Sequence, residues 1–174
     1  ILVCNFFRYY FKKYEAIKNI NNFQSLVNQF CIRLKYRFDI DLDYNEIVSE
    51  FDKKSLNYSD IYTLLCSKIF KSTDFNITGE HAVNEWRNIK NFHKILPKGK
   101  IIFLLRDPRD ILCSFKRSTI AKKNDYLISI FNYVDLINYV YASKKKYNNK
   151  IHIVKFNEIK KNPRLIIKKV CKFL

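Results

Sequence analysis

The sequence contains no methionine, only two glycines and only three prolines. Because glycine and proline are the usual turn residues, the turns of this chain must rely mainly on Asn, Asp and Ser. An open reading frame normally begins with Met, whereas this chain begins within an apolar run, Ile1-Leu2-Val3. We therefore expect the natural protein to be longer than the given residues, at its start and also at its end.

The sequence also lacks a cysteine pair and a long apolar run. No stretch reaches the roughly 18–20 apolar residues that a membrane span needs, and no secretory signal is visible. The cysteines lie far apart with no C-x-x-C pair, so neither a zinc site nor a disulfide framework follows; they are Cys4, Cys31, Cys66, Cys113 and Cys171. We interpret them as small buried residues in a reducing compartment, and expect a cytoplasmic protein without a bound metal.

Acidic residues are scarce relative to basic ones. The chain has 33 Lys and Arg against 16 Asp and Glu, for a net charge of +17. Two interpretations stay open: a solvated basic exterior that reflects compositional bias, and a face that binds polyanions. Either field attracts anionic ligands. We expect no specific nucleic-acid partner, because the lysines are spread along the whole chain.

Residues 1–74 have the apolar spacing of helices. One stripe spans residues 6–14, and a clearer one at i, i+3, i+4 and i+7 runs from Phe23 to Leu34. Asp43 followed by Glu46 is typical of a capping box that opens a helix. A further helix is predicted to begin near Ser59 or Asp60.

Residues 75–174 alternate between strand and helix patterns. The apolar runs predict strands at 75–78, 101–105 and 151–156, and helices at 84–96, after 106, around 127–141, and from 162–163 onward. The unbroken run Ile101–Leu105 is typical of a strand buried on both faces of a parallel sheet. This order predicts a single α/β domain with a mainly parallel sheet between helical layers, in which 1–74 is the helical part.

The segment after this strand carries the candidate chemistry. Asp107 fits a helix N-cap and Pro108 the first helical position, so Arg106 is expected at the carboxyl end of the strand, where α/β sheets bind ligands. Ser114 lies two helical turns further and faces the same side. Arg106 and Ser114 are therefore able to share a phosphate. The alternative is that Arg106 pairs with Asp107 or Asp110 and has only a structural role.

Four ordered elements resemble the sulfotransferase family. The segment Lys100–Ser114 resembles its nucleotide-binding R-D-P-R-D-x-x-x-S segment, and Gly79–Glu85 resembles its G-E-K-T-P-x-N-E element. Ile153–Ile159 with Asn162-Pro163 resembles the family's R-Y-E-D-L-x-x-x-P strand and helix start, and Lys172–Leu174 resembles the F-L that precedes a glycine.

The resemblance implies a three-layer α/β/α fold like that of P-loop NTPases and transfer of a sulfuryl group from 3′-phosphoadenosine 5′-phosphosulfate (PAPS), without a metal. It implies that residues 75–174 form a nucleotide-binding part, in which Arg106 and Ser114 bind the 3′-phosphate of PAPS. The acceptor would be a hydroxyl or amine of a small molecule, a glycan or a protein.

The chain departs from the family in two places. Its only glycines are Gly79 and Gly99, so the glycine-bearing loop that cradles the 5′-phosphosulfate is missing, as is a G-x-x-x-x-G-K-[ST] loop. We therefore expect these 174 residues to be an inactive piece of the enzyme. In place of the family's K-T-P stands His81-Ala82-Val83. Aligned with the K-T-H-x-P element of cytosolic members, His81 would be the general base; aligned with bacterial-type members, it simply replaces Lys.

Two functions from different classes follow from this sequence. The first is a PAPS-dependent sulfotransferase. The second is a catalytically inactive protein of the same fold that binds anions or nucleic acid. A nucleoside-phosphate kinase is disfavoured because the Walker-type loop is lacking.

Overall fold

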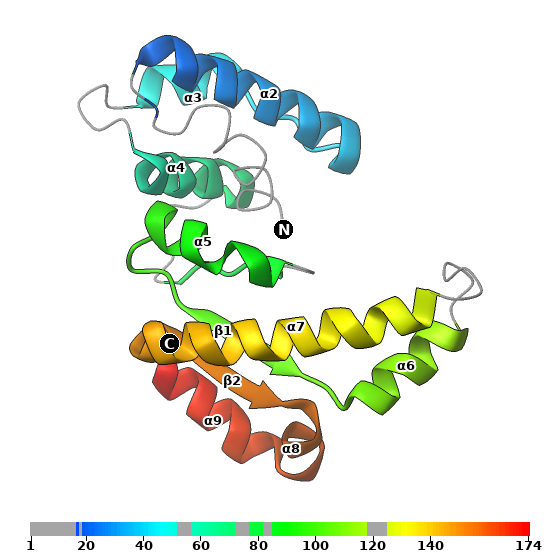
Figure 1. The fold of residues 1–174 in the computed structure, drawn as a ribbon. Helices are drawn as coiled ribbons and strands as arrows, with labels where there is room; N and C mark the ends of the chain where they lie inside the picture. Colours follow the sequence, from blue (N-terminus) through cyan, green and yellow to red (C-terminus); the bar gives the residue numbers. More distant parts are fainter. Residues whose placement is uncertain (1–16, 18, 52–56, 72–76, 82–84, 118–124) are drawn as a thin grey trace. The chain divides into compact units, whose positions relative to one another are not determined.

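The computed structural model describes residues 17, 19–51, 57–71, 77–81, 85–117 and 125–174 (Figure 1). The chain divides into two compact units, Ile1–Pro97 and Lys98–Leu174. Each unit is considered by itself. The predicted stripe over residues 6–14 lies outside the described residues.

The clear apolar stripe of the first unit forms helix α2, Ile20–Phe38. The Asn19 side chain accepts a hydrogen bond from the Asn22 backbone N–H at 2.9 Å and so caps the helix start. The helix ends at Asp39, whose φ of 52° is left-handed. The prediction of this helix is confirmed, and its buried residues are Phe23, Leu26, Val27, Phe30 and Leu34.

Two shorter helices complete the core of this unit. Helix α3, Tyr44–Glu50, begins at the predicted cap, since Asp43 Oδ1 accepts from the backbone N–H groups of Asn45 and Glu46. Helix α4, Tyr58–Phe70, begins one or two residues earlier than predicted. Its cap is Asn57, whose side chain accepts from the Asp60 backbone N–H. The helices share one apolar core that includes Phe30, Ile47, Ile61 and Leu65.

The last part of the first unit matches the sequence less closely. The helix predicted over 84–96 is observed as a 3₁₀ turn, Glu85–Asn88 (η1), followed by α5, Ile89–Ile95. The strand predicted over 75–78 has its first two residues outside the described ones, and Ile77 and Thr78 lie in no strand. A strand needs a hydrogen-bonding partner, and the described sheet pairs only two other segments.

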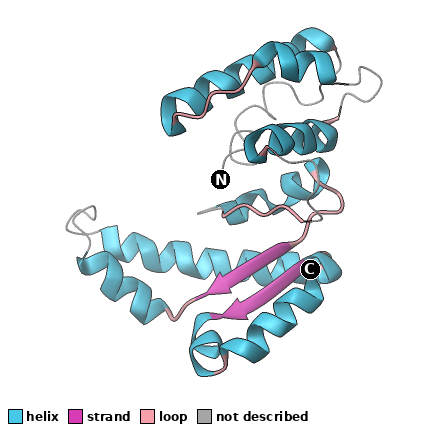
Figure 2. Cartoon of the chain, turned by 180° about the vertical axis from the view of Figure 1, so that it is seen from behind, coloured by secondary structure: helices cyan, strands magenta, loops and turns pink. Residues whose placement is uncertain are grey.

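The second unit is built on those two strands. β1, Ile101–Leu105, and β2, Ile151–Lys155, are parallel, with Ile101 opposite Ile151 and Leu105 opposite Lys155 (Figure 2). Both predicted strands are confirmed. Because they are parallel and in register, their carboxyl ends lie at the same edge of the sheet.

Helices make up the rest of the second unit. After β1 come α6, Pro108–Arg117, and α7, Asp125–Lys146, and a 3₁₀ turn, Asn148–Lys150, leads into β2. After β2 come α8, Phe156–Lys161, and α9, Pro163–Phe173. Both α7 and α9 pack against β2. Pro163 occupies the start of α9, as predicted.

The predicted burial of β1 on both faces is wrong. Its side chains alternate in burial, and Ile102 is 41% and Leu104 56% exposed. The described sheet has two strands, and α7 and α9 pack mainly against β2, so alternate side chains of β1 stay exposed. The described fold is mostly helical α/β with a small parallel sheet, and the larger three-layer architecture stays a prediction.

The cysteines are less uniform than expected. Cys66 is buried in the helical core, and its burial raises the pKa of the thiol to about 11. Cys113 and Cys171 are exposed, which corrects the interpretation of all cysteines as buried residues. The described residues contain no group of three or more His, Cys, Asp or Glu placed to hold a metal ion. Among the described helices, none has the length and apolar character to cross a bilayer.

Candidate active site

The turn from β1 into α6 has the predicted capping geometry. Asp107 Oδ1 accepts a hydrogen bond from the Arg109 backbone N–H at 2.9 Å, and the Asp107 carbonyl accepts from Ile111 N–H at 3.1 Å. These bonds make Asp107 the N-cap and Pro108 the first helical residue. The turn therefore places Arg106 directly after the last residue of β1.

Asp107 is fully engaged by the neighbouring Arg109. The Arg109 guanidinium donates to both carboxylate oxygens, from Nε at 3.0 Å and from Nη2 at 2.7 Å. These side-chain bonds, together with the backbone bond from Arg109, lower the pKa of Asp107 to about 2. Asp107 is thus ionised throughout the physiological range, with its charge matched by Arg109.

The Arg106 guanidinium makes no such close pair with a carboxylate. Its Nε lies 3.7 Å from Asp110 Oδ2, which is too long for a hydrogen bond. The guanidinium carbon lies 5.5 Å from the centre of the Phe156 ring, and the side chain is 47% exposed. Because Asp107 pairs with Arg109 and Asp110 only approaches, the planar donor fork of Arg106 remains available for a ligand.

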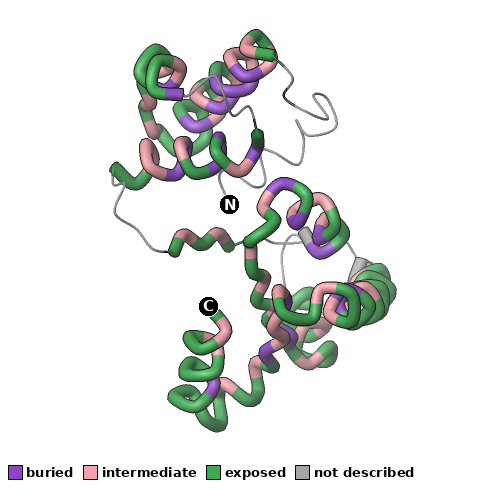
Figure 3. Tube along the Cα trace, turned by 90° about the vertical axis from the view of Figure 1, so that its left-hand side faces the viewer, coloured by how far each residue is buried: buried purple, intermediate pink, exposed green. Residues whose placement is uncertain are grey.

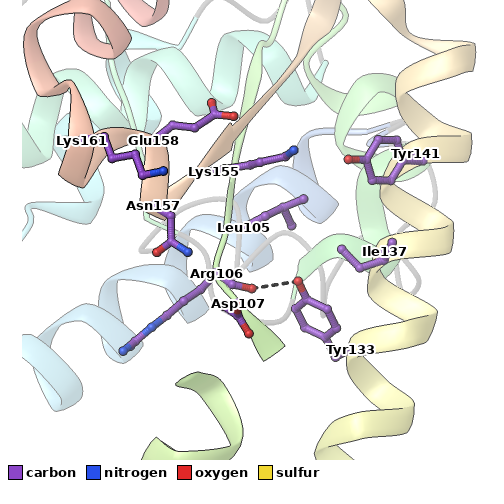
Figure 4. A pocket seen from close by; sticks show the side chains of 10 residues that line it. All are labelled: Leu105, Arg106, Asp107, Tyr133, Ile137, Tyr141, Lys155, Asn157, Glu158 and Lys161. Atoms are coloured by element: carbon purple, nitrogen blue, oxygen red, sulfur yellow. Dashed lines mark hydrogen bonds between the residues drawn. The ribbon is translucent and has the colours of Figure 1, made fainter. Parts of the chain in front are cut away.

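The backbone of Arg106 is held by the long helix α7. The Tyr133 hydroxyl donates a hydrogen bond to the Arg106 carbonyl at 2.8 Å, the dashed line in Figure 4. Burial raises the pKa of Tyr133, and the charges of Asp107 and Tyr141 raise it further. Tyr133 therefore remains a protonated donor at neutral pH and fixes the end of β1.

A pocket of about 460 Å³ opens at this edge of the sheet. It lies where both strands end, between α7 on one side and α8 on the other, and ten side chains line it (Figure 4). They are Leu105, Arg106, Asp107, Tyr133, Ile137, Tyr141, Lys155, Asn157, Glu158 and Lys161. The carboxyl edge of a parallel sheet is where α/β proteins bind their ligands.

A model of the sulfotransferase family matches residues 8–174. The chain belongs to the sulfotransferase family. The match spans nearly the whole sequence and so includes residues 8–74, in which the sequence showed no element that resembles the family. Membership indicates sulfuryl transfer in general. No curated protein matches the chain, and no solved structure does.

The three predicted site residues differ in their local surroundings. Arg106 lines the pocket. Ser114 is exposed on α6, seven residues after the Asp107 cap, and is not among the lining residues. His81 is exposed in the irregular segment 77–81 of the first unit.

Several residues that line this pocket were not predicted from the sequence. Lys155, Asn157, Glu158 and Lys161 come from the end of β2 and from α8. The predicted strand over 151–156 contained the signal, because the carboxyl end of a parallel neighbour lies beside that of β1. No sequence pattern indicated Tyr133, because its hydrogen bond to the Arg106 carbonyl depends on how α7 packs.

Replacing Asp107 with Asn should lower the melting temperature in a pH-dependent way. Asn keeps a cap oxygen but loses the charge that pairs with Arg109. The pKa of Asp107 is depressed from its ordinary value of 3.8 to about 2, so its contribution is complete above about pH 4 and disappears near pH 2. Thermal unfolding of both proteins across this range should show a difference that shrinks as pH falls.

The matched control for this experiment is Asp110→Asn. Asp110 approaches Arg106 at 3.7 Å and interacts with the Arg109 charge only at a distance, so its replacement should change the melting temperature less than Asp107→Asn above about pH 4. A larger effect from Asp110→Asn than from Asp107→Asn would contradict the described pairing.

Proposed function

We propose that this protein is a PAPS-dependent sulfotransferase that sulfates a hydroxyl or amine, with Arg106 as the anchor for the 3′-phosphate of PAPS. The observation that carries the proposal is the unequal pairing of two arginines in one turn. Arg109 neutralises Asp107 at 2.7 and 3.0 Å, whereas Arg106 makes only a 3.7 Å approach to Asp110. A half-exposed arginine at the pocket suits a dianionic phosphate.

The surroundings of Arg106 fit a phosphate group. Lys155 and Lys161 also line the pocket, and the carboxylate of Asp107 is already neutralised by Arg109. Glu158 is the remaining acidic residue of the lining. Hence the lining carries more unmatched positive than negative charge, which favours an anion.

Ser114 is proposed as the second group on the same phosphate. It lies two turns along α6 from the Asp107 cap, and residues seven apart share a helix side. A hydroxyl there is able to donate to a phosphate oxygen that Arg106 also holds. The two residues would position the nucleotide and would not take part in bond making.

PAPS supplies the sulfuryl group when it is bound. By analogy with phosphoryl transfer, the bond from sulfur to the acceptor oxygen or nitrogen forms as the bond from sulfur to the bridging phosphate oxygen breaks. The leaving group is adenosine 3′,5′-bisphosphate, and the proton of the acceptor passes to a base. The role of Arg106 and Ser114 is alignment, on which such a transfer depends strongly.

His81 is proposed as that base. Histidine is the side chain that most often serves as a general base in enzymes. The support is the placement of His81 in an element that resembles K-T-H-x-P of cytosolic family members. The other alignment, in which His81 replaces the family's Lys, assigns it no proton transfer.

The proposed function is tested by following labelled sulfate from PAPS to a panel of phenols, sugars, amines and peptides. In the natural protein, transfer should occur and should fall strongly in Arg106→Ala, while Arg164→Ala, which removes the same charge outside the pocket lining, should retain it. Nucleotide binding without transfer to any acceptor class would instead favour the inactive anion-binding protein.

A further inference from the structure

Helix α9 has an unusually uniform composition on its outer side. Its residues Pro163–Phe173 contain cations and apolar residues but no acidic, amide or hydroxyl side chain. The inward residues are Ile166, which is buried, with Val170 and Phe173 partly buried. The outward residues form what we call the α9 basic face: Arg164, Leu165, Lys168, Lys169 and Lys172.

The cations of this face are regularly spaced. Arg164, Lys168 and Lys172 recur every four residues, so they form a row with a step of about 6 Å along the helix. None of them takes part in the ion pairs found among the described residues. Lys160 and Lys161 of α8 precede the row and extend its positive charge.

The face also exposes aliphatic side chains. Figure 3 shows most of the helix next to the C-terminus as exposed. In α9, Leu165 is 48% exposed and lies among the cations, and Ile167 at the flank is 53% exposed. A nucleic acid or a sulfated polysaccharide is held mainly through its charged groups, to which exposed aliphatic side chains add little. Cations that surround aliphatic side chains are instead typical of helices that lie on anionic membranes.

The C-terminal end of α9 is anchored to the sheet by side-chain contacts. Lys100, just before β1, donates from Nζ to the carbonyls of Phe173 at 2.6 Å and Leu174 at 3.0 Å. The Phe173 ring stacks on His152 of β2, with centroids 5.1 Å apart. These contacts fix the end of α9 against the sheet, so the basic face is presented as a rigid surface.

We propose that the α9 basic face docks this protein on an anionic lipid surface, with the cations at the headgroups and Leu165 inserted between them. The proposal does not depend on sulfuryl transfer. Each Lys or Arg near an anionic leaflet contributes about fivefold in affinity, and salt screens this attraction. Leu165 adds an apolar contribution that salt does not weaken.

The test is co-sedimentation of the whole chain with vesicles of phosphatidylcholine, either alone or mixed with phosphatidylserine. We expect binding to the mixed vesicles only. The double variant Lys168→Glu/Lys172→Glu should weaken that binding at least about 25-fold, from about fivefold per lysine. The matched control is Lys90→Glu/Lys94→Glu, which makes the same charge change at the same spacing on α5 and should bind like the unchanged protein.

Leu165→Ser is the second variant, because it leaves the charge unchanged and removes only an exposed side chain. It should weaken vesicle binding, but it should not affect binding to heparin or duplex DNA. Circular dichroism verifies that each variant is folded. The proposal is overturned if the Lys168/Lys172 variant binds mixed vesicles normally, or if the protein binds heparin or DNA and ignores vesicles.

Discussion

Replacing Arg106 with alanine should weaken the binding of adenosine 3′,5′-bisphosphate by about 2–4 kcal/mol, or roughly 30- to 1,000-fold. The reason is that Arg106 presents a planar donor fork at the carboxyl end of β1, and the acidic neighbour in the turn is already paired with Arg109. Isothermal calorimetry with both proteins measures the loss directly.

Two further variants make this result specific. Arg106→Lys should recover only part of the affinity, because an ammonium group cannot reproduce two parallel hydrogen bonds. Arg164→Ala removes the same charge from an exposed position on α9 outside the pocket lining and should cost much less. If Arg164→Ala weakened binding as much as Arg106→Ala, the affinity would reflect net charge and not a site.

Replacing His81 with alanine should lower kcat for sulfuryl transfer by about 10²- to 10⁴-fold, the usual contribution of a general base. The affinity for adenosine 3′,5′-bisphosphate should stay unchanged, because His81 is not assigned to the nucleotide. Steady-state kinetics measures kcat, and calorimetry with adenosine 3′,5′-bisphosphate measures the affinity.

His81→Lys separates the two alignments of this element. A lysine restores the residue that bacterial-type members carry, so recovery of activity in His81→Lys would mean that the histidine merely replaces it. If His81 is the base, a protonated lysine cannot accept the proton at neutral pH, and His81→Lys should be as inactive as His81→Ala.

Local signals in the sequence predicted most of the elements. The stripe from Phe23 to Leu34, the cap at Asp43 and the Asp107-Pro108 helix start all became the expected structure. These patterns depend on interactions within a few residues, namely side-chain periodicity and capping hydrogen bonds. The helices that these patterns predict therefore depend little on contacts with distant parts of the chain.

Predictions that depend on contacts between residues far apart in the sequence were less accurate. The burial of β1 was inferred from its apolar run, but burial depends on what covers each face, and Ile102 and Leu104 are exposed. The hydrogen bond from Tyr133 to the Arg106 carbonyl joins residues 27 positions apart, and no sequence spacing predicts such a contact. Arg109 was expected only as part of a motif, whereas its pairing with Asp107 is what leaves Arg106 available.

The most direct test of the account compares two ligands in two proteins by calorimetry. The ligands are adenosine 3′,5′-bisphosphate and adenosine 5′-phosphate, which differ only in the 3′-phosphate, and the proteins are the unchanged chain and Arg106→Ala. The account predicts that the unchanged protein prefers the bisphosphate by about 2–4 kcal/mol and that Arg106→Ala loses most of this preference. An equal preference in both proteins would contradict it, because the 3′-phosphate would then be held somewhere else.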